Sequence, residues 1–282
     1  MSDSLPDIQI TKSNIEMGIK EVGVENVKLP FMLESKNNSF HDMLANVSIR
    51  VGLDKDIKGI SMSRLLLTLK EFLNKPLKHF LIEEILKKLQ ENLESNSSFI
   101  NFKFQLPRIR KSPISDNEFP LFYDCKFEGR LKNDIFRFFQ GIEVQYSSYC
   151  PCSAELSKNL IEKGFDQGYP HAQRSFAKIL VEVPPMRYLW LEEIIEMIES
   201  VIKTIPYPIV KRVDEQEIAK IASQNPIFVE DAIRLISYKL DNCDKIYDWI
   251  IKCIHEESIH TSEAIAINWK GIEGGFDGRY YL

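Results

Sequence analysis

The stretch from Met43 to Leu53 reads MLANVSIRVGL, and apolar residues recur at every second position in it. That is the period of a strand with one buried face. Residues 54–59 (DKDIKG) are typical of a turn. Leucines at helical spacing follow, with Ser61 or Ser63 as the cap, and they predict a helix that Pro76 ends. A half-buried strand, a tight turn and an amphipathic helix are therefore the pattern from which the rest of the chain can be read.

The same two periods recur on both sides of this stretch. Strands are predicted at residues 21–33, 43–53, 97–106, 121–131, 136–146, 175–183, 245–254 and 264–269. Helices are predicted at 61–73, 79–93, 190–203, 214–222 and 226–239. Pro30 indicates that the first strand is an edge strand or a strand entry. Pro107 would close the third strand, and Pro226 would occupy a first helical position. The first half has the order strand, strand, helix, helix, strand, strand, and the second half repeats it loosely with a third helix. This order predicts an α+β fold with antiparallel sheets and helices on one face.

The composition limits the classes of function. Hydrophobic residues make up 44% of the 282 residues, so the chain can bury a sizeable core. A net charge of -5 argues against a protein that coats nucleic acid, although a local basic pocket for a phosphorylated small molecule remains possible. No apolar run reaches the roughly 18 residues of a membrane span, and the N-terminus lacks the pattern of a signal peptide. Five cysteines without a regular framework favour a reducing compartment, so we expect a cytoplasmic protein.

Residues 147–175 contain the side chains best suited to chemistry, in the stretch SSYCPCSAELSKNLIEKGFDQGYPHAQRS. Cys150 and Cys152 flank Pro151 at a predicted strand end, and a short helical segment precedes His171. A thiolate and an imidazole can hold a zinc or iron ion, or they can act as a nucleophile and its base. A redox dithiol normally has two intervening residues, so the C-P-C spacing does not indicate one. On the residues alone, both the ligand and the nucleophile interpretations stay open.

Other candidates are weak when taken singly. Glu215 could be a first-turn carboxylate that stabilises the N-terminus of a helix. The same holds for Glu230 and Asp231, although a carboxylate pair directly after an apolar triplet is less usual on a solvated face. His260 lies in a polar segment just before a strand, where a turn histidine is unremarkable. None of these residues decides the function by itself.

Several blocks together resemble the type IB GTP cyclohydrolases, in the order in which that family has them. The blocks are residues 19–24 (IKEVGV), 58–64 (KGISMSR), 148–153 (SYCPCS), 171–175 (HAQRS), 211–215 (KRVDE), 225–231 (NPIFVED) and 257–260 (ESIH). The resemblance extends along most of the chain. It implies the conversion of GTP to 7,8-dihydroneopterin triphosphate and formate, a hydrolysis and rearrangement that begins tetrahydrofolate (pterin) biosynthesis.

The resemblance also implies roles for single residues. The family's one divalent metal ion, which could be zinc, manganese or iron, would be held by Cys150, His171 and Glu215. One thiolate, one imidazole and one carboxylate leave a coordination position free, as in a catalytic metal site. Glu230 would anchor the purine through two hydrogen bonds, and His260 would move protons. Cys150, Glu230 and His260 are thus the predicted catalytic residues.

Cations are needed for the triphosphate, and the blocks point to candidates by position: Lys58, Arg64, Arg174, Lys211 and Arg212. Ordinary surface charge is the alternative for each of them. The family fold is the tunnelling fold, which implies two tandem modules, at residues 1–132 and 133–282. It further implies a homo-oligomer, usually a tetramer, with active sites between subunits, and neither a nucleic-acid partner nor a membrane partner.

Two departures from the family pattern bear on this interpretation. Ser61 stands where the family usually has a histidine, and residues 161–169 look like an insertion between Cys150 and His171. Two alternatives follow. A nitrile reductase of queuosine synthesis has the same fold and would use Cys150 as a nucleophile with NADPH. A degenerate homologue would keep the fold and only bind a purine, and Ser61 is the residue that favours it.

Overall fold

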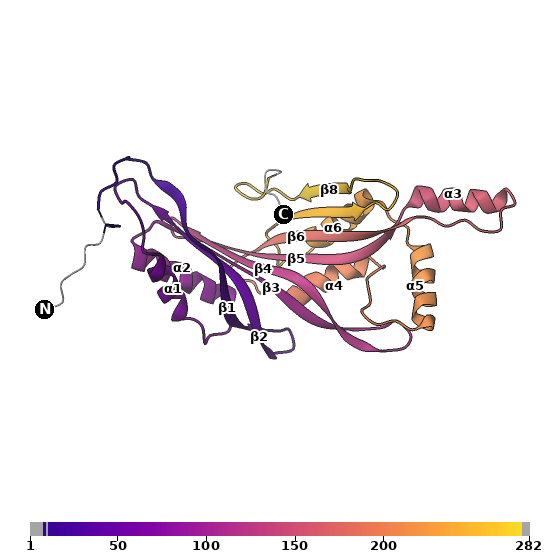
Figure 1. Ribbon diagram of the computed structural model, residues 1–282, viewed down its shortest axis with the longest axis horizontal. Helices are drawn as coiled ribbons and strands as arrows, with labels where there is room; N and C mark the ends of the chain where they lie inside the picture. Colours follow the sequence, from indigo (N-terminus) through magenta and orange to yellow (C-terminus); the bar gives the residue numbers. More distant parts are fainter. Residues whose placement is uncertain (1–7, 10, 278–282) are drawn as a thin grey trace. The chain divides into compact units, whose positions relative to one another are not determined.

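The computed structural model describes residues 8, 9 and 11–277, which form strands and helices in the predicted order. The strands are β1 (Ile19–Glu34), β2 (Phe40–Leu53), β3 (Ser97–Lys111), β4 (Glu118–Lys132), β5 (Ile135–Tyr149), β6 (Ala172–Val183), β7 (Asp248–Glu256) and β8 (Ala264–Trp269). The helices are α1 (Met62–Lys70), α2 (His79–Leu93), α3 (Pro151–Glu162), α4 (Leu191–Val201), α5 (Arg212–Gln224) and α6 (Val229–Asp241). Figure 1 shows these elements along the chain. The α+β class is confirmed.

The strands are hydrogen-bonded in chain order, from β1 to β8, as one eight-stranded sheet. The pairs β1/β2, β2/β3, β6/β7 and β7/β8 are antiparallel. The edge position of β1, with Pro30 in it, is confirmed. Alternation in β2 is confirmed as well, because Ala45, Val47, Ile49 and Val51 are buried.

Three predicted boundaries at prolines are wrong. Helix α1 ends at Lys70, six residues before the proline, Pro76, that was expected to end it. The strand β3 continues through Pro107 to Lys111. Its pairing with β2 ends at Lys103, so Pro107 lies beyond the β2–β3 ladder and interrupts none of its hydrogen bonds. Helix α6 begins at Val229 and not at Pro226. The segment before α6 is tied to β5 instead, because the N–H of Ile227 donates to the carbonyl oxygen of Tyr149.

The chain forms two compact units, and the first comprises Met1–Gln105, Lys126–Phe139 and Pro184–Arg187. Its core lies between α2 and the strands. The helix buries one stripe of side chains at helical spacing: Leu81, Ile82, Ile85, Leu86 and Leu89. Gly129 on β4 allows this close packing, since a Cβ atom there would stand 2.3 Å from Cγ2 of Ile82.

The second unit comprises Leu106–Cys125, Gln140–Val183 and Tyr188–Leu282. Here α6 packs against β7 and β8, and α4 packs against α6. Both helices bury an apolar stripe: Ile194, Ile195 and Ile198 from α4, and Ala232, Ile233, Ile236 and Leu240 from α6. The predicted module boundary between residues 132 and 133 is not decided by this division and stays a prediction.

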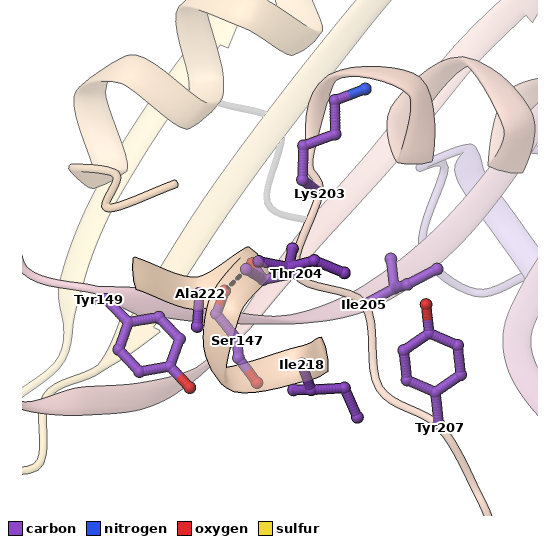
Figure 2. A pocket seen from close by; sticks show the side chains of 9 residues that line it. Ser147, Tyr149, Lys203, Thr204, Ile205, Tyr207, Ile218 and Ala222 are labelled. Atoms are coloured by element: carbon purple, nitrogen blue, oxygen red, sulfur yellow. Dashed lines mark hydrogen bonds between the residues drawn. The ribbon is translucent and has the colours of Figure 1, made fainter. Parts of the chain in front are cut away.

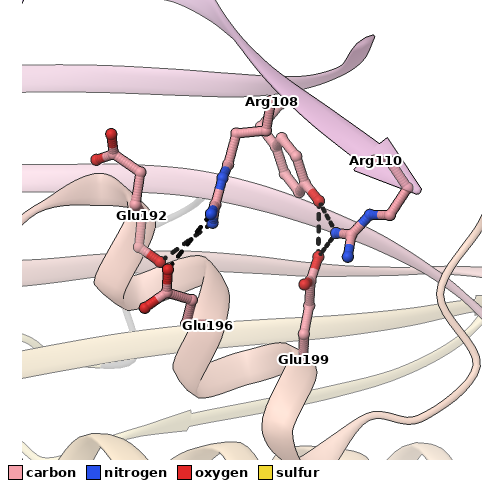
Figure 3. Close-up of polar contacts among 6 residues, drawn as sticks. Arg108, Arg110, Glu192, Glu196 and Glu199 are labelled. Atoms are coloured by element: carbon pink, nitrogen blue, oxygen red, sulfur yellow. Dashed lines mark hydrogen bonds and ion pairs between the residues drawn. The ribbon is translucent and has the colours of Figure 1, made fainter. Parts of the chain in front are cut away.

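Ion pairs connect α4 to β3 within the second unit, as Figure 3 shows. The guanidinium of Arg108 lies 3.3 Å from Oε1 of Glu196. Arg110 pairs with Glu199, and both contact the hydroxyl of Tyr123, at 2.7 Å from Arg110 and 2.6 Å from Glu199. Burial and the neighbouring Glu199 carboxylate raise the pKa of Tyr123, so this hydroxyl stays protonated and donates to Glu199. No described helix is both long and apolar enough to cross a membrane.

Candidate functional site

The predicted thiol and imidazole come together where β5 ends and β6 begins. The strand β5 ends at Tyr149 and α3 begins at Pro151, so Cys150 lies at the junction as the residue before the helix. The backbone N–H of Cys150 donates to the carbonyl oxygen of His171 at 3.3 Å. Cys150 is half-buried and its thiol is free. The prediction that Cys150 stands at a strand end is confirmed.

The predicted insertion does not separate His171 from Cys150. The chain leaves through α3 and returns close along it, because a Cβ atom on Gly168 would stand 2.4 Å from the carbonyl oxygen of Ser157. The N–H of His171 then donates to the hydroxyl of Ser153 at 3.2 Å, one turn into α3. Residues 161–169 therefore form a projection, and the contacts at its base hold His171 in place.

The imidazole of His171 has polar partners on one side only. Its Nδ1 lies 3.0 Å from Oε1 of Gln173 and 3.6 Å from Oε2 of Glu257. The amide of Gln173 donates to Glu257 at 3.3 Å, so the three side chains form a small network. Among the described residues, Nε2 of His171 has no hydrogen-bond partner. Metal-binding histidines commonly have this arrangement, with one ring nitrogen held by an amide or carboxylate and the other facing the ion.

Glu215 lies on the first turn of α5, with an exposed side chain. It makes no side-chain hydrogen bond or ion pair with another described residue. The described part of the chain holds no group of three His, Cys, Asp or Glu side chains that could bind a metal ion. The structure thus brings Cys150 and His171 together and leaves Glu215 on its own helix, so the three-residue ligand set stays a prediction.

Glu230 lies at the start of α6, and His260 lies just after the end of β7. Glu230 is exposed on the first turn of α6. His260 is exposed in the turn between β7 and β8, where its N–H donates to the carbonyl oxygen of Glu257. Glu257 contacts the His171 network, so the His260 turn is connected through Glu257 to the imidazole of His171. The roles in purine binding and proton transfer stay predictions.

A buried polar network beneath these residues was missed by the sequence reasoning. The imidazole of His255 lies 2.9 Å from the hydroxyl of Tyr146 and 3.2 Å from that of Ser148, which contacts Ser175 at 2.7 Å. All four side chains are at most 1% exposed. They join β5, β6 and β7 at the ends that carry Cys150 and His171. The available signal was the strand period, since Tyr146 and Ser148 lie two residues apart, on the same face of β5.

Burial determines the charge of His255. It lowers the pKa of His255 to about 4, and the negative charge of Glu230 opposes this shift only in part. The imidazole is therefore neutral in the folded protein at neutral pH. Its two nitrogens can then each take a hydroxyl partner, one as donor and one as acceptor.

We expect this residue to make the protein less stable in mild acid. Between the ordinary pKa of 6.5 and the folded value of about 4, the unfolded chain binds a proton that the folded chain does not. The neutral imidazole therefore contributes its full stability above a pH of 6.5. As the pH falls below that value, the free energy of unfolding decreases by at most about 1.4 kcal/mol per pH unit. The free energy of unfolding, measured with urea at several pH values, should depend less steeply on pH in His255→Gln than in the wild type. Equal slopes in the two proteins would contradict this, and exposed His41→Gln serves as the control.

The predicted phosphate-binding cations are all exposed. In the first unit, Arg64 lines a hollow of about 480 Å³, open to solvent, together with Gln9, Gly59 and Ser61. Ser61 is the residue before α1, yet its hydroxyl makes no capping hydrogen bond. Lys58 directly precedes Gly59, which lines this hollow. Arg174 on β6 belongs to the second unit.

A second hollow lies next to Cys150 in sequence, between the end of β5 and α5. Figure 2 shows Tyr149 and Tyr207 at its two sides, with Ile218 and Ala222 of α5 between them. It measures about 260 Å³ with its open solvent included. That is below the roughly 300–1,000 Å³ of small-molecule sites, so it does not hold a nucleotide by itself.

Solved structures with a similar backbone are urate oxidases. The uricase of Arthrobacter globiformis matches 95% of this chain and 98% of its own, with a TM-score of 0.59 and 7% identity. A uricase from Bacillus fastidious matches 91% of this chain and 93% of its own, with a TM-score of 0.53 and 8% identity. At such low identity the likeness concerns the fold alone. It supports the tunnelling fold as the class of this protein.

Sequence comparisons identify the family. The family model described as type I GTP cyclohydrolase folE2 matches residues 5–266. A curated relative named GTP cyclohydrolase FolE2, from Hydrogenovibrio crunogenus, is 34% identical over 96% of this chain and 96% of its own length. One of the same name from Dinoroseobacter shibae is 34% identical over 95% of this chain and 75% of its own. The chain belongs to the type I GTP cyclohydrolase FolE2 family, and the nitrile reductase alternative is not favoured.

Proposed function

We propose that this protein is a GTP cyclohydrolase I that converts GTP to 7,8-dihydroneopterin triphosphate and formate. Membership of the FolE2 family over residues 5–266 supports the reaction. The observation that carries the proposal at the level of the site is the junction of β5 and β6. There Cys150 and His171 are joined by a backbone hydrogen bond, at the position where the family blocks place them.

We further propose a divalent metal ion held by Cys150, His171 and Glu215. The residues fit such an ion in their chemistry. The Cys150 thiol is free, His171 is held at Nδ1 by Gln173 and Glu257, and Glu215 is exposed on α5. When bound, the ion would act as a Lewis acid toward water and the purine. Zinc, manganese and iron all suit this mixed donor set.

The protein's own residues would bind the substrate and move its protons. The carboxylate of Glu230 can accept two hydrogen bonds, from the N1–H and the exocyclic amine of guanine. The imidazole of His260 can carry a proton to and from the purine ring near neutral pH. Lys58, Arg64 and Arg174 are the cations proposed for the triphosphate, and all three are exposed.

We also propose that the protein is a homo-oligomer. The strands β1 and β8 form the two edges of the sheet. On β8, Ile265, Ile267 and Trp269 are between 41% and 53% exposed. A sheet edge with exposed apolar side chains is a template for pairing with another chain. The mass of the purified protein in solution tests this, and a monomer at the concentration of the assay would contradict it.

The reaction is tested directly with purified protein and GTP. We expect formate release and, after oxidation, pterin fluorescence when Mn(II), Zn(II) or Fe(II) is added. A chelator should abolish both signals, and a single added metal should restore them. Absence of formate with all three metals would contradict the proposal.

The Glu230→Gln variant should weaken GTP binding. The amide replaces one acceptor oxygen by a donor, which then faces a donor of the guanine edge. Breaking such a hydrogen-bonded contact costs about 1–3 kcal/mol, so KM for GTP should rise by about 5- to 150-fold. The matched control is Asp231→Asn on the same turn, whose carboxylate pairs with Arg234 on the surface. An unchanged KM in Glu230→Gln would remove this residue from the purine site.

A further inference from the structure

Helix α5, which carries Glu215, has little apolar surface to hold it in place. Of its 13 residues, only Asp214 and Ala222 are buried, while Ile218 and Ile221 are half-buried. Helices are normally positioned by an apolar stripe against the core. In α5 the buried residue of the first turn is a carboxylate. The position of this turn therefore depends on what that carboxylate contacts.

The carboxylate of Asp214 accepts four hydrogen bonds. Its Oδ1 accepts from the backbone N–H groups of Ile114 and Ser115, at 2.9 and 2.8 Å. Its Oδ2 accepts from the hydroxyl of Ser115 at 2.6 Å and from the N–H of Lys211 at 2.7 Å. Hydrogen bonds to an ionised acceptor are stronger than those between neutral groups. Three of the four come from the turn between β3 and β4, and Figure 1 shows α5 standing at the tip of that hairpin.

Asp214 is fully buried, and three of the hydrogen bonds to its carboxylate come from the turn between β3 and β4. The turn that supplies these donors is itself held by side chains. The hydroxyl of Ser112 accepts from the N–H of Asn117 at 3.0 Å, and the amide of Asn117 donates to Ser115. The carboxylate of Asp214 thus accepts hydrogen bonds from a turn whose shape is already fixed by its own side chains.

The segment after α5 is tied next to Cys150. The side-chain amide of Asn225 donates to the carbonyl oxygen of Ile221 at 2.7 Å and closes the helix. Two residues further on, Ile227 donates to Tyr149, the residue before Cys150. The helix therefore runs between two fixed points, the β3–β4 turn and the end of β5. Releasing the first of them would let the first turn of α5 move relative to Cys150.

We propose that Asp214 and Ser115 are positioning residues, which fix the first turn of α5 and thereby the carboxylate of Glu215. This inference rests on the proposed function, in which Glu215 is a metal ligand. Glu215 directly follows Asp214, and its own side chain has no partner among the described residues that would hold it. The position of the Glu215 carboxylate relative to an ion is then determined by the backbone at Asp214.

Asp214→Asn is the decisive variant because it keeps the shape of the side chain. Its amide nitrogen replaces one acceptor, so the N–H of Lys211 or those of the β3–β4 turn face a donor. We expect the affinity for Mn(II) or Zn(II), measured by competition with a chromophoric chelator, to fall by about 10- to 100-fold. Ser115→Ala removes one hydrogen bond of the four and should cost about fivefold. Glu217→Gln is the matched control, since Glu217 on the same helix pairs, among the described residues, only with Lys220, and this variant should bind metal as the wild type does.

Two readouts separate positioning from general stability. Hydrogen–deuterium exchange in residues 212–218 should be faster in Asp214→Asn while exchange in β5 and β6 is unchanged. Saturating metal should restore most of kcat, which would not happen if the variant were largely unfolded. Wild-type metal affinity in folded Asp214→Asn and Ser115→Ala would overturn the proposal. If the wild type neither binds metal nor releases formate, the proposed function fails. In that case faster exchange in α5 still supports the anchor, and unchanged exchange overturns it.

Discussion

Cys150→Ala is expected to lose both tight metal binding and formate release. The thiol is the softest of the three proposed ligands, and the backbone of Cys150 is hydrogen-bonded to that of His171. Removing a hydrogen-bond partner of a metal ligand typically costs about 10- to 100-fold in affinity or activity, so removing a ligand itself should cost more than about 100-fold. The metal content after dialysis and the rate of formate release from GTP are the two measurements.

Cys243→Ala provides the matched control for this variant. Cys243 is also a free and half-buried thiol, but it lies after α6, away from the β5–β6 junction. It should keep wild-type metal content and turnover. The experiment also separates a ligand from a nucleophile. A Cys150→Ala protein that still binds one metal ion yet has no activity would indicate covalent chemistry at the thiol, and full activity without metal would end the metal-hydrolase proposal.

The periodicity of the sequence was sufficient for the architecture. Alternation in residues 43–53 and the leucine stripe of 79–93 are local patterns that each bury one face, so the elements could be predicted without knowing their partners. Boundaries were wrong at Pro76, Pro107 and Pro226, where the local preference of proline did not decide where the element ends. A proline ends a strand only where its N–H is needed, and β3 pairs with β2 only up to Lys103. That boundary depends on the neighbouring strand and is invisible in the residues around the proline.

The site was predictable in a different way. The family blocks named Cys150 and His171, and the structure places them together in spite of the longer loop between them. The residues that hold the site were not predictable from the sequence. The sequence analysis gave no role to Asp214 or His255. Their roles come from contacts with Ile114, Ser115, Tyr146 and Ser148, about 100 residues away in sequence, and no local period encodes such contacts.

These buried groups explain how the exposed candidate residues of the proposed site can be held in position. Glu215, Glu230 and His260 are all exposed, so their own packing does little to orient them. Each lies close to a buried polar contact. Asp214 is adjacent to Glu215, Glu230 acts electrostatically on His255, and Glu257 connects the His260 turn to His171. Sites of this kind need their supporting residues as much as the reacting ones.

His260→Ala is expected to lower kcat strongly while metal binding stays intact. General acid–base catalysis by a positioned side chain contributes about 10²- to 10⁴-fold, and we expect a loss in that range. KM for GTP should change little, because the proposed anchoring of the purine belongs to Glu230. Single-turnover formate release, measured with saturating GTP and metal, separates the chemical step from product release.

Two comparisons make this result specific to proton transfer. His41→Ala removes an exposed histidine of the first unit, whose ring contacts only Ser39 among the described residues, and it should keep the wild-type rate. Added imidazole should restore part of the activity of His260→Ala, because a small diffusible base can replace a missing proton carrier but cannot replace a structural contact. If His260→Ala turns over GTP at the wild-type rate, the proton must move through another group. The imidazole of His171 and the carboxylate of Glu257, which lie 3.6 Å apart, would then be the next residues to substitute.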